Sequence, residues 1–313
     1  MPEIIDKHKS NFTRMYLIFI IISCLILTGY YMPVHRYHEN NTVESRYKNY
    51  LTATSRTLVV YVFAQTYTLS EINLAFFIRT AVRKSHPADY YFILQQMNGT
   101  VFDETKLPVI PSNAHYIQHE NKCFDIGTVG WFLSNGIIDK NKYKYFIFLN
   151  SSVRGPFIVS YYDNPIWYTV FTRRLNDHIK LVGCTISCER GAHVQSYVWA
   201  LDLKTLDFLL KKTSVFTCHK TKADTVTIAE IGASQTLLKS GYGIDSLMTK
   251  YHGVDFRLNV TDICSHLDNP VYDKAVNGIT LDPYEVVFVK MKDGAPPFYD
   301  NLERMRAYEK WIH

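Results

Sequence analysis

Short apolar runs alternate along the chain with segments whose apolar residues recur at helical spacing. Runs rich in β-branched and aromatic residues predict strands at residues 57–63, 90–94, 143–149, 179–183, 194–201 and 285–290. Helical spacing predicts helices at residues 69–84, 203–212 and 223–240, of which the last ends at Gly241. Strand, helix and strand within about 40 residues form the βαβ unit of an open α/β sheet, so we expect an open mixed sheet flanked by helices.

The predicted helix 223–240 carries two different faces. Glu230 and Ser234 are four residues apart and are expected to share one face. The buried stripe is expected to consist of Ile228, Ile231, Leu237 and Leu238.

An uncharged segment at residues 15–34 is long enough to cross a membrane. Residues 16–27 are almost wholly aliphatic or aromatic, and at about 1.5 Å per residue such a helix reaches across a hydrocarbon layer of ~30 Å. Three cations precede the segment, and Arg36 is the only one in the eight residues after it, so the tail is expected in the cytosol. A cleaved signal peptide is the alternative, but residues 29–32 lack an A-x-A-like site.

The chain therefore divides into four predicted parts. We expect a cytosolic tail at 1–14, a transmembrane signal anchor at 15–34, a polar stem at 35–56 and one folded domain at 57–313. The composition supports a folded domain, because 47% of the 313 residues are hydrophobic and 14% are aromatic. The net charge of +5 comes without any basic block, which argues against nucleic-acid binding and suits small anionic ligands.

Cysteines and glycosylation triplets suit an oxidising compartment. Cys24 lies in the predicted span, and five more follow in the folded domain, at Cys123, Cys184, Cys188, Cys218 and Cys264. Five cannot all pair, and no second close pair follows Cys184 and Cys188 at zinc-finger spacing, so disulfides or buried thiols are expected. N-glycosylation triplets begin at Asn98 and Asn259.

The most informative junction follows the hydrophobic run 143–149. The run stops at Asn150, after which two serines, Arg154 and a Gly-Pro step follow. In open α/β sheets ligands bind beyond the carboxyl ends of strands, so these polar side chains are candidates for a crevice. An ordinary turn made of the same residues is the alternative.

An ordered series of motifs resembles rhamnan-synthesis-F-type proteins and related eukaryotic membrane-anchored proteins of the nucleotide-sugar transferase type. The resemblance spans residues 59–290. The motifs are Asn121-x-x-x-Asp125-x-Gly127, Asn150-Ser-Ser-x-x-Gly155-Pro156, His193-x-Gln195-Ser196, Glu230-Ile-Gly-x-Ser234 and Leu281-x-Pro-Tyr-Glu-Val-Val-Phe-Val-Lys290.

The resemblance implies a GT-A-like fold, Rossmann-type in its nucleotide-binding half, that acts on a nucleoside-diphosphate sugar. An inverting glycosyl transfer needs a carboxylate to take the proton of the acceptor hydroxyl. Glu230 is the candidate base, because it matches the family's Glu-Ile-Gly motif and stands early in a helix. A surface glutamate that serves the helix dipole is the alternative.

The departing diphosphate also needs stabilisation. Most GT-A transferases hold a divalent metal with an Asp-x-Asp pair, yet this chain contains none, and Asn150-Ser151-Ser152 stands in its place. We therefore expect no resident metal, although Mn²⁺ or Mg²⁺ is not excluded. Arg154 and Lys290 are the candidate cations for phosphate, unless they are solvated surface charges.

The remaining candidates are divided between donor and acceptor. Asn121, Asp125 and Gly127 are expected beside the nucleotide, together with Asn150 and Ser151, although Asp125 could instead open a helix as its N-cap. Acceptor hydroxyls are expected at His193, Gln195 and Ser196.

The sequence thus favours a type II membrane glycosyltransferase of the Golgi or endoplasmic reticulum with a lumenal catalytic domain. Its partners would be a nucleotide-sugar donor, a glycan or glycoconjugate acceptor and, through residues 15–34, the membrane. A catalytically inactive relative that binds nucleotide sugar or glycan is the alternative. A hydrolase is disfavoured, since neither a Gly-x-Ser-x-Gly elbow nor a His-Glu-x-x-His zinc motif occurs.

Overall fold

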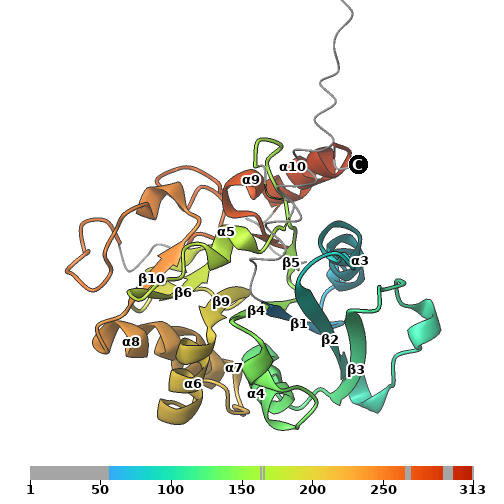
Figure 1. Ribbon diagram of the computed structural model, residues 1–313. Coiled ribbons are helices and arrows are strands. Elements are labelled where there is room, and N and C mark those ends of the chain that lie inside the picture. The colour runs from blue at the N-terminus through green and yellow to red at the C-terminus, as the bar shows by residue number, and fades with distance from the viewer. Residues whose placement is uncertain (1–55, 163, 165, 265–268, 292–298, 312–313) are drawn as a thin grey trace, which may run out of the picture. The chain divides into compact units, whose positions relative to one another are not determined.

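The computed structural model describes residues 56–162, 164, 166–264, 269–291 and 299–311 (Figure 1). The predicted tail, the transmembrane segment and all but the last residue of the stem lie outside these ranges. Within the described ranges, no helix is both long and apolar enough to cross a membrane.

A seven-stranded sheet in the order β10-β6-β9-β4-β1-β2-β3 lies at the centre (Figure 1). Its parallel strands are β1 (Thr57–Ala64), β2 (Ala88–Gln96), β3 (Ala114–Glu120), β4 (Tyr145–Asn150), β6 (Ile179–Gly183) and β10 (Gly243–Ser246). β9 (Val198–Asp202) runs antiparallel between β4 and β6. The chain moves outward from β1 to β3 and returns to the other side of β1 at β4. The strand order therefore reverses between β1 and β4, which is where open α/β sheets bind ligands.

Helices cover both faces of the sheet (Figure 1). On one face lie α3 (Ser70–Ala81), α5 (Thr169–Thr172), α9 (Pro283–Val286) and α10 (Tyr299–Glu309). On the other face lie α4 (Asp125–Ser134), α6 (Leu203–Lys212) and α8 (Gly232–Lys239). The buried rings of Phe77, Trp167 and Phe288 meet under the first group. The predicted α/β sheet flanked by helices is confirmed at this level.

Short elements connect this framework. They include the 3₁₀ turns η1 (Met97–Gly99), η2 (Glu104–Lys106), η3 (Lys140–Lys142) and η5 (Thr249–Tyr251). Two small antiparallel pairs join β5 (Val153–Arg154) to β11 (Val289–Lys290) and β7 (Ile186–Ser187) to β8 (His193–Val194). Both pairs extend the chain that leaves the carboxyl ends of β4 and β6.

The predicted helix 223–240 is a single helix with an irregular middle. It runs through α7 (Lys222–Asp224), the π-helical turn η4 (Thr225–Ile231) and α8. The hydroxyl of Thr221 accepts a hydrogen bond from the Asp224 N–H at its start, and Gly241 ends it with φ +82°.

The buried stripe of this helix differs from the prediction. Ile231 and Leu237 are buried, but Ile228 is 41% exposed and Leu238 is only half-buried. The wider π turn changes the register of the side chains before it relative to α8. Ala229, Ala233 and Ser234 therefore complete the buried face.

Two predicted strands are wrong as drawn. The run 194–201 is divided between β8 and β9, because the backbone N–H groups of Gln195 and Ser196 bond to Thr185 and Glu230 and not to a neighbouring strand. The run 285–290 begins as the helical turn α9, since Asp282 caps it and Pro283 fits its first position. Only Val289 and Lys290 of that run are strand.

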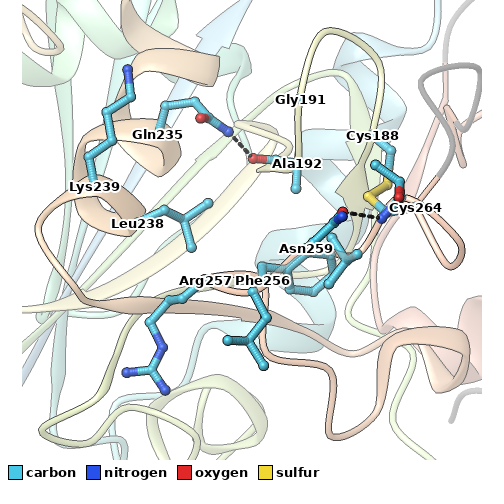
Figure 2. A pocket seen from close by; sticks show the side chains of 13 residues that line it. Cys188, Gly191, Ala192, Gln235, Leu238, Lys239, Phe256, Arg257, Asn259 and Cys264 are labelled. Carbon is cyan, nitrogen blue, oxygen red and sulfur yellow. Dashed lines mark hydrogen bonds between the residues drawn. A yellow bond between two sulfur atoms is a disulfide. The ribbon is translucent and has the colours of Figure 1, made fainter.

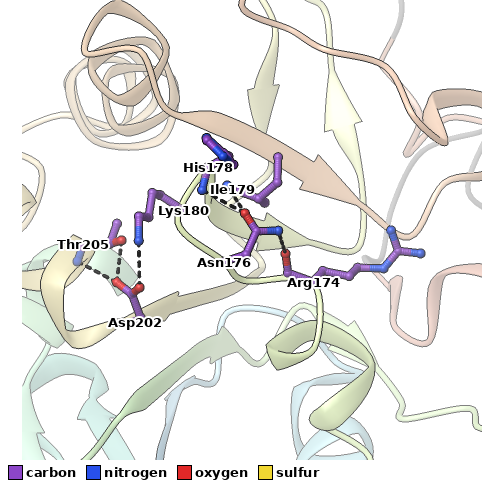
Figure 3. A network of polar contacts seen from close by, with 7 residues as sticks. All are labelled: Arg174, Asn176, His178, Ile179, Lys180, Asp202 and Thr205. Atoms are coloured by element: carbon purple, nitrogen blue, oxygen red, sulfur yellow. Dashed lines mark hydrogen bonds and ion pairs between the residues drawn. The ribbon is translucent and has the colours of Figure 1, made fainter.

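The amino-terminal side of the sheet is held by a polar network around Asp202 (Figure 3). One oxygen of Asp202 accepts from the backbone N–H of Thr205 at 2.8 Å and so caps α6, and the other accepts from Lys180 Nζ at 3.1 Å. Burial by itself raises the pKa of this carboxyl, but the bonds from Thr205 and Lys180 outweigh it and hold the pKa below its ordinary value.

Two disulfides link distant parts of the chain. Cys123 is joined to Cys218, and Cys188 is joined to Cys264. Cys184 is a buried free thiol. The expectation of disulfides and buried thiols is confirmed, and the spacing of Cys184 and Cys188 marks no zinc site.

Candidate functional site

A cavity of about 480 Å³ lies beyond the carboxyl end of β6, and neither Asn150 nor Ser151 at the end of β4 lines it. Its walls come from the segment after β6, from α7 and η4, from residues 269–272 and from β11. The side chains that line it and carry charge or polar groups are Glu189, Arg190, His193, Gln195, Lys222, Glu230, Asn269, Tyr272 and Lys290. Four of the predicted site residues, His193, Gln195, Glu230 and Lys290, therefore meet in one cavity.

Glu230 stands half-buried in the wall of this cavity, on the π-helical turn. Its Oε1 accepts a hydrogen bond of 3.0 Å from the backbone N–H of Ser196. Four residues further on, the hydroxyl of Ser234 accepts from the backbone N–H of Val194 at 3.0 Å. The shared face predicted for Glu230 and Ser234 is thus confirmed, and it fixes the segment 194–196 against the helix.

The second oxygen of Glu230, Oε2, accepts no hydrogen bond from any residue within the described ranges. A carboxylate that is oriented through one oxygen and open through the other has the geometry of a general base. Its orientation comes from a backbone group, which holds it without neutralising its charge.

Asp125 and Asn150 form a second pair of polar side chains close to Glu230. Asn150 Nδ2 donates to Asp125 Oδ2, and the Asp125 Oδ1 accepts from the backbone N–H of Ile126 at 3.0 Å. Burial raises the pKa of Asp125, and the neighbouring charge of Glu230 raises it further, while the bond from Asn150 and the charge of Lys290 act against the rise. The charges of Glu230 and Lys290 thus act on Asp125, although neither Asp125 nor Asn150 lines the cavity.

Asp125 is also the first residue of α4. Its side chain accepts from the next residue, Ile126, while the N-cap position belongs to Phe124. The alternative in which Asp125 is an N-cap is therefore wrong by one residue, and the carboxylate is directed to Asn150 at the end of β4.

His193 and Gln195 are buried in the wall of the cavity and held in place. His193 Nδ1 donates to the carbonyl of Gly191 at 2.8 Å. Gln195 Nε2 donates to Asn269 Oδ1 at 3.2 Å, and its Oε1 accepts from the Thr185 hydroxyl at 2.8 Å. This chain of bonds makes the wall rigid, which suits side chains that shape a binding site.

Three cations face the same cavity, and only Lys290 among them was predicted. Its ammonium lies 5.4 Å from the centre of the Tyr197 ring. Arg190 and Lys222 are exposed side chains that sequence reasoning missed. A lysine in the first turn of a helix is unfavourable to the helix dipole. This unusual position is the sequence feature that could have indicated a functional role for Lys222. Arg190 belongs to no motif.

Arg154 and Ser151 lie apart from the cavity. Arg154 is 2% exposed, and it donates to Asn73 Oδ1 at 2.9 Å and to Glu309 Oε1 at 2.6 Å. The Ser151 hydroxyl donates to the carbonyl of Ala64 at 2.9 Å and so ties the end of β4 to the end of β1. The structure places both residues in the framework below the site.

Gly127 and Asn121 are not in the cavity wall either. A Cβ on Gly127 would lie 2.9 Å from the carbonyl oxygen of Thr217, so this glycine permits close packing beside the Cys123–Cys218 disulfide. Asn121 is exposed beyond β3 and donates to the sulfur of Met97 at 2.9 Å.

A second cavity of about 600 Å³ is lined by residues of the loop that carries Arg190 (Figure 2). Cys188 and Gly191 of this loop line it, together with side chains from α8 and from residues 256–264. The Cys188–Cys264 disulfide and a 2.8 Å bond from Gln235 Nε2 to the carbonyl of Ala192 hold the loop between the two cavities (Figure 2).

The residues at the end of β4 do not fit a resident divalent cation. The amide nitrogen of Asn150 donates to Asp125, its amide oxygen accepts from Ser152, and the hydroxyl of Ser151 is engaged with Ala64. Neutral groups that are already paired are weak ligands for Mg²⁺ or Mn²⁺. Nor do three His, Cys, Asp or Glu side chains gather at a metal-binding distance anywhere in the described ranges.

Comparison with known proteins gives structural similarity without sequence similarity. No family model matches the chain, and no curated protein matches it. The mannosyltransferase PcManGT from Pyrobaculum calidifontis, solved in complex with GDP-Man and Mn2+, is 10% identical, with a TM-score of 0.36 over 64% of this chain and 60% of that chain. The resemblance to rhamnan-synthesis-F-type proteins stays a prediction.

The glycosyltransferase GlyE from Streptococcus pneumoniae TIGR4 is similar in two structures. Its apo form is 13% identical, with a TM-score of 0.33 over 63% of this chain and 46% of that chain. The other structure is 10% identical, with a TM-score of 0.34 over 64% and 47%. The chain therefore spans about half the length of GlyE and three fifths of PcManGT.

Proposed function

We propose that this chain is a glycosyltransferase that moves a sugar from a nucleoside-diphosphate donor to a glycan or glycoconjugate acceptor. The observation that carries the proposal is Glu230, a carboxylate oriented by the Ser196 N–H in a cavity that also holds Lys290. A base and a cation in one cavity beyond the strand ends match the two electrostatic needs of glycosyl transfer.

The reaction follows from this arrangement. The acceptor hydroxyl gives its proton to Glu230 Oε2 as its oxygen bonds to the anomeric carbon of the donor sugar. The bond between that carbon and the diphosphate oxygen breaks, and the nucleoside diphosphate leaves with the electron pair. Lys290 stabilises the leaving charge, and no step needs a metal ion.

The other predicted residues take supporting places in the proposal. Asp125 and Asn150 are assigned to the donor side, because the charges of Glu230 and Lys290 act on Asp125, which accepts a hydrogen bond from Asn150. His193 and Gln195 form the acceptor side of the cavity, and Ser196 orients Glu230 through its backbone N–H. Arg154 is left out of the chemistry, since its guanidinium pairs with Glu309.

The membrane topology belongs to the same proposal. A signal anchor at residues 15–34 would place this domain in the lumen of the Golgi or endoplasmic reticulum as part of a type II membrane protein. Two disulfides in the described chain favour such an oxidising compartment. Protection of the domain from added protease in sealed microsomes is the result expected.

The test measures hydrolysis of nucleotide sugars by the full-length protein in detergent, across a donor panel, with and without a chelator. We expect turnover to survive the chelator and to fall about 10²- to 10⁴-fold in Glu230→Gln, which is the usual contribution of a general base. Glu303→Gln, an exposed residue of α10, is the matched control and should keep full activity.

Two outcomes would contradict the proposal in different ways. Donor binding without turnover in the wild type would favour the inactive relative that binds nucleotide sugar as a sensor or partner. Turnover that Glu230→Gln leaves intact would remove Glu230 from the reaction.

A further inference from the structure

Two cations that line the cavity have no partner among the described residues. Within the described ranges, neither the Arg190 guanidinium nor the Lys222 ammonium has a hydrogen bond, an ion pair or a ring contact. Elsewhere in the same ranges, Arg56, Arg174 and Arg257 each pair with an aspartate. Arg190 and Lys222 thus line the cavity without an ion pair to a carboxylate of the described residues.

The charge of the cavity as a whole is set by five groups. Arg190, Lys222 and Lys290 supply three positive charges, and Glu189 and Glu230 supply two negative ones. Glu189 is occupied, because its Oε2 accepts from Asn269 Nδ2 at 3.0 Å. Glu230 is held by Ser196 on the helix side. The three positive charges exceed the two negative ones, which favours an anion in the cavity.

The three cations come from separate elements. Arg190 lies in the loop after β7, Lys222 begins the helix that carries Glu230, and Lys290 ends β11. The disulfide at Cys188 holds the first of these elements, and the pairing of β11 with β5 holds the third. All three line the same cavity, and a guanidinium fork and ammonium groups are suited to the oxygens of a diphosphate.

We infer that Arg190 and Lys222, together with Lys290, bind the diphosphate of the donor and neutralise its charge as it leaves. This inference rests on the proposed function for the identity of the donor. In Asp-x-Asp enzymes a metal ion stabilises the departing diphosphate, and here the cationic side chains would do so. Arg190 and Lys222 complete this anion site.

The experiment measures binding of inorganic pyrophosphate to the full-length protein by titration calorimetry, in a chelating buffer of low ionic strength. Arg190→Gln and Lys222→Gln are each expected to weaken binding about tenfold, which corresponds to about 1.4 kcal/mol. Lys212→Gln makes the same charge change on α6, outside the cavity, and should leave the affinity as it is. Added salt should weaken wild-type binding, because exposed charges are screened.

The following results would support or overturn the inference. Equal affinity in the wild type and in both variants, or no wild-type binding at all, would overturn the inference. Glu230→Gln removes a negative charge from the cavity and should bind pyrophosphate at least as tightly as the wild type, so loss of turnover without loss of binding separates the two roles. Pyrophosphate binding that depends on Arg190 and Lys222, in a protein that turns over no donor, would keep the anion site and remove the transferase. Both side chains are exposed, so unchanged thermal unfolding of the variants will show that the fold is kept.

Discussion

At the scale of single residues, two cationic side chains with the same predicted role lie in different environments. Arg154 and Lys290 were both predicted to bind phosphate, and they lie on the paired strands β5 and β11. Lys290 faces the cavity, whereas Arg154 is buried against α3 and α10. Strand alternation explains the difference, because neighbouring positions of a strand point to opposite faces. The sequence motif alone does not reveal which face is which.

Removal of Glu309 should destabilise the protein without affecting its ligands. Glu309→Ala removes the ion-pair partner of the buried Arg154. The Nη2 atom of Arg154 already lacks a hydrogen-bond partner among the described residues. We expect a loss of about 1.5–3 kcal/mol in the free energy of unfolding, measured by chemical denaturation. Glu303→Ala, on the same helix but exposed, should change it by less than about 0.5 kcal/mol. A fall in pyrophosphate affinity in Glu309→Ala would return Arg154 to the site.

Asp125 should make the folded protein less stable as the pH rises. Its pKa is raised above the ordinary 3.8 by burial and by Glu230, so the folded state holds this proton more tightly than the unfolded state. The stabilisation is complete below pH 3.8 and is lost as the pH rises through the raised value. We therefore expect the melting temperature of Asp125→Asn to rise relative to that of the wild type as the pH increases from acidic to neutral. A constant difference across that range would contradict this assignment.

At the scale of elements, the regular strands and helices were predictable and the irregular ones were not. The runs 57–63, 179–183 and 203–212 carry their own periodicity, and the structure confirms them as β1, β6 and α6. The break before β9 depends on Glu230, which is distant in sequence and takes the N–H of Ser196. Asp282 and Pro283 form a typical start signal for the helix α9. The apolar residues that follow them led to the prediction of a strand instead.

The same reasoning applies to the site. Four predicted residues line the cavity, and each belongs to one of the motifs that carry the family resemblance. Arg190 and Lys222 could not be found in this way, since their contribution depends on how the loop after β7 and the start of α7 meet in space.

Replacement by alanine should change the stability of the protein in opposite directions at two helix glycines. A Cβ on Gly130 of α4 would lie 1.8 Å from the carbonyl oxygen of Phe216, whereas one on Gly232 would lie 3.4 Å from its nearest atom, the carbonyl oxygen of Thr227. Gly130→Ala should cost about 1–3 kcal/mol of stability through overpacking. Gly232→Ala should add about 0.5–1 kcal/mol, because alanine is the better helix former. Urea denaturation of both variants measures this, and equal effects would contradict the packing of α4.

At the scale of the whole molecule, the two disulfides join segments that are 95 and 76 residues apart in the sequence. The first links the start of α4 to the segment before α7, and the second fixes the loop between the two cavities (Figure 2). Both elements that they hold carry site residues. The fold and the site are thus stabilised by the same covalent links.

Loss of the Cys188–Cys264 link should affect stability and binding together. In the double variant Cys188→Ser/Cys264→Ser, we expect about 2–4 kcal/mol less stability, since a long loop is released in the unfolded chain. Pyrophosphate affinity should also fall, because Arg190 follows Cys188 by two residues. Unreduced peptide mapping checks the pairing, and Cys184 should resist alkylation until the protein unfolds, because burial raises the pKa of its thiol. A link to Cys184 would refute this pattern.

The hydrogen bond between Asn150 and Asp125 has one more consequence. Asn150-Ser151-Ser152 reads as an attachment signal for oligosaccharide, as do the triplets at Asn98 and Asn259. The latter two are exposed, but the carboxamide of Asn150 is turned inward and engaged. If the domain is lumenal, as proposed, pairing of β4 with β1 competes in time with the enzyme that attaches oligosaccharide, and a chain that folds first keeps Asn150 bonded to Asp125 and free of carbohydrate.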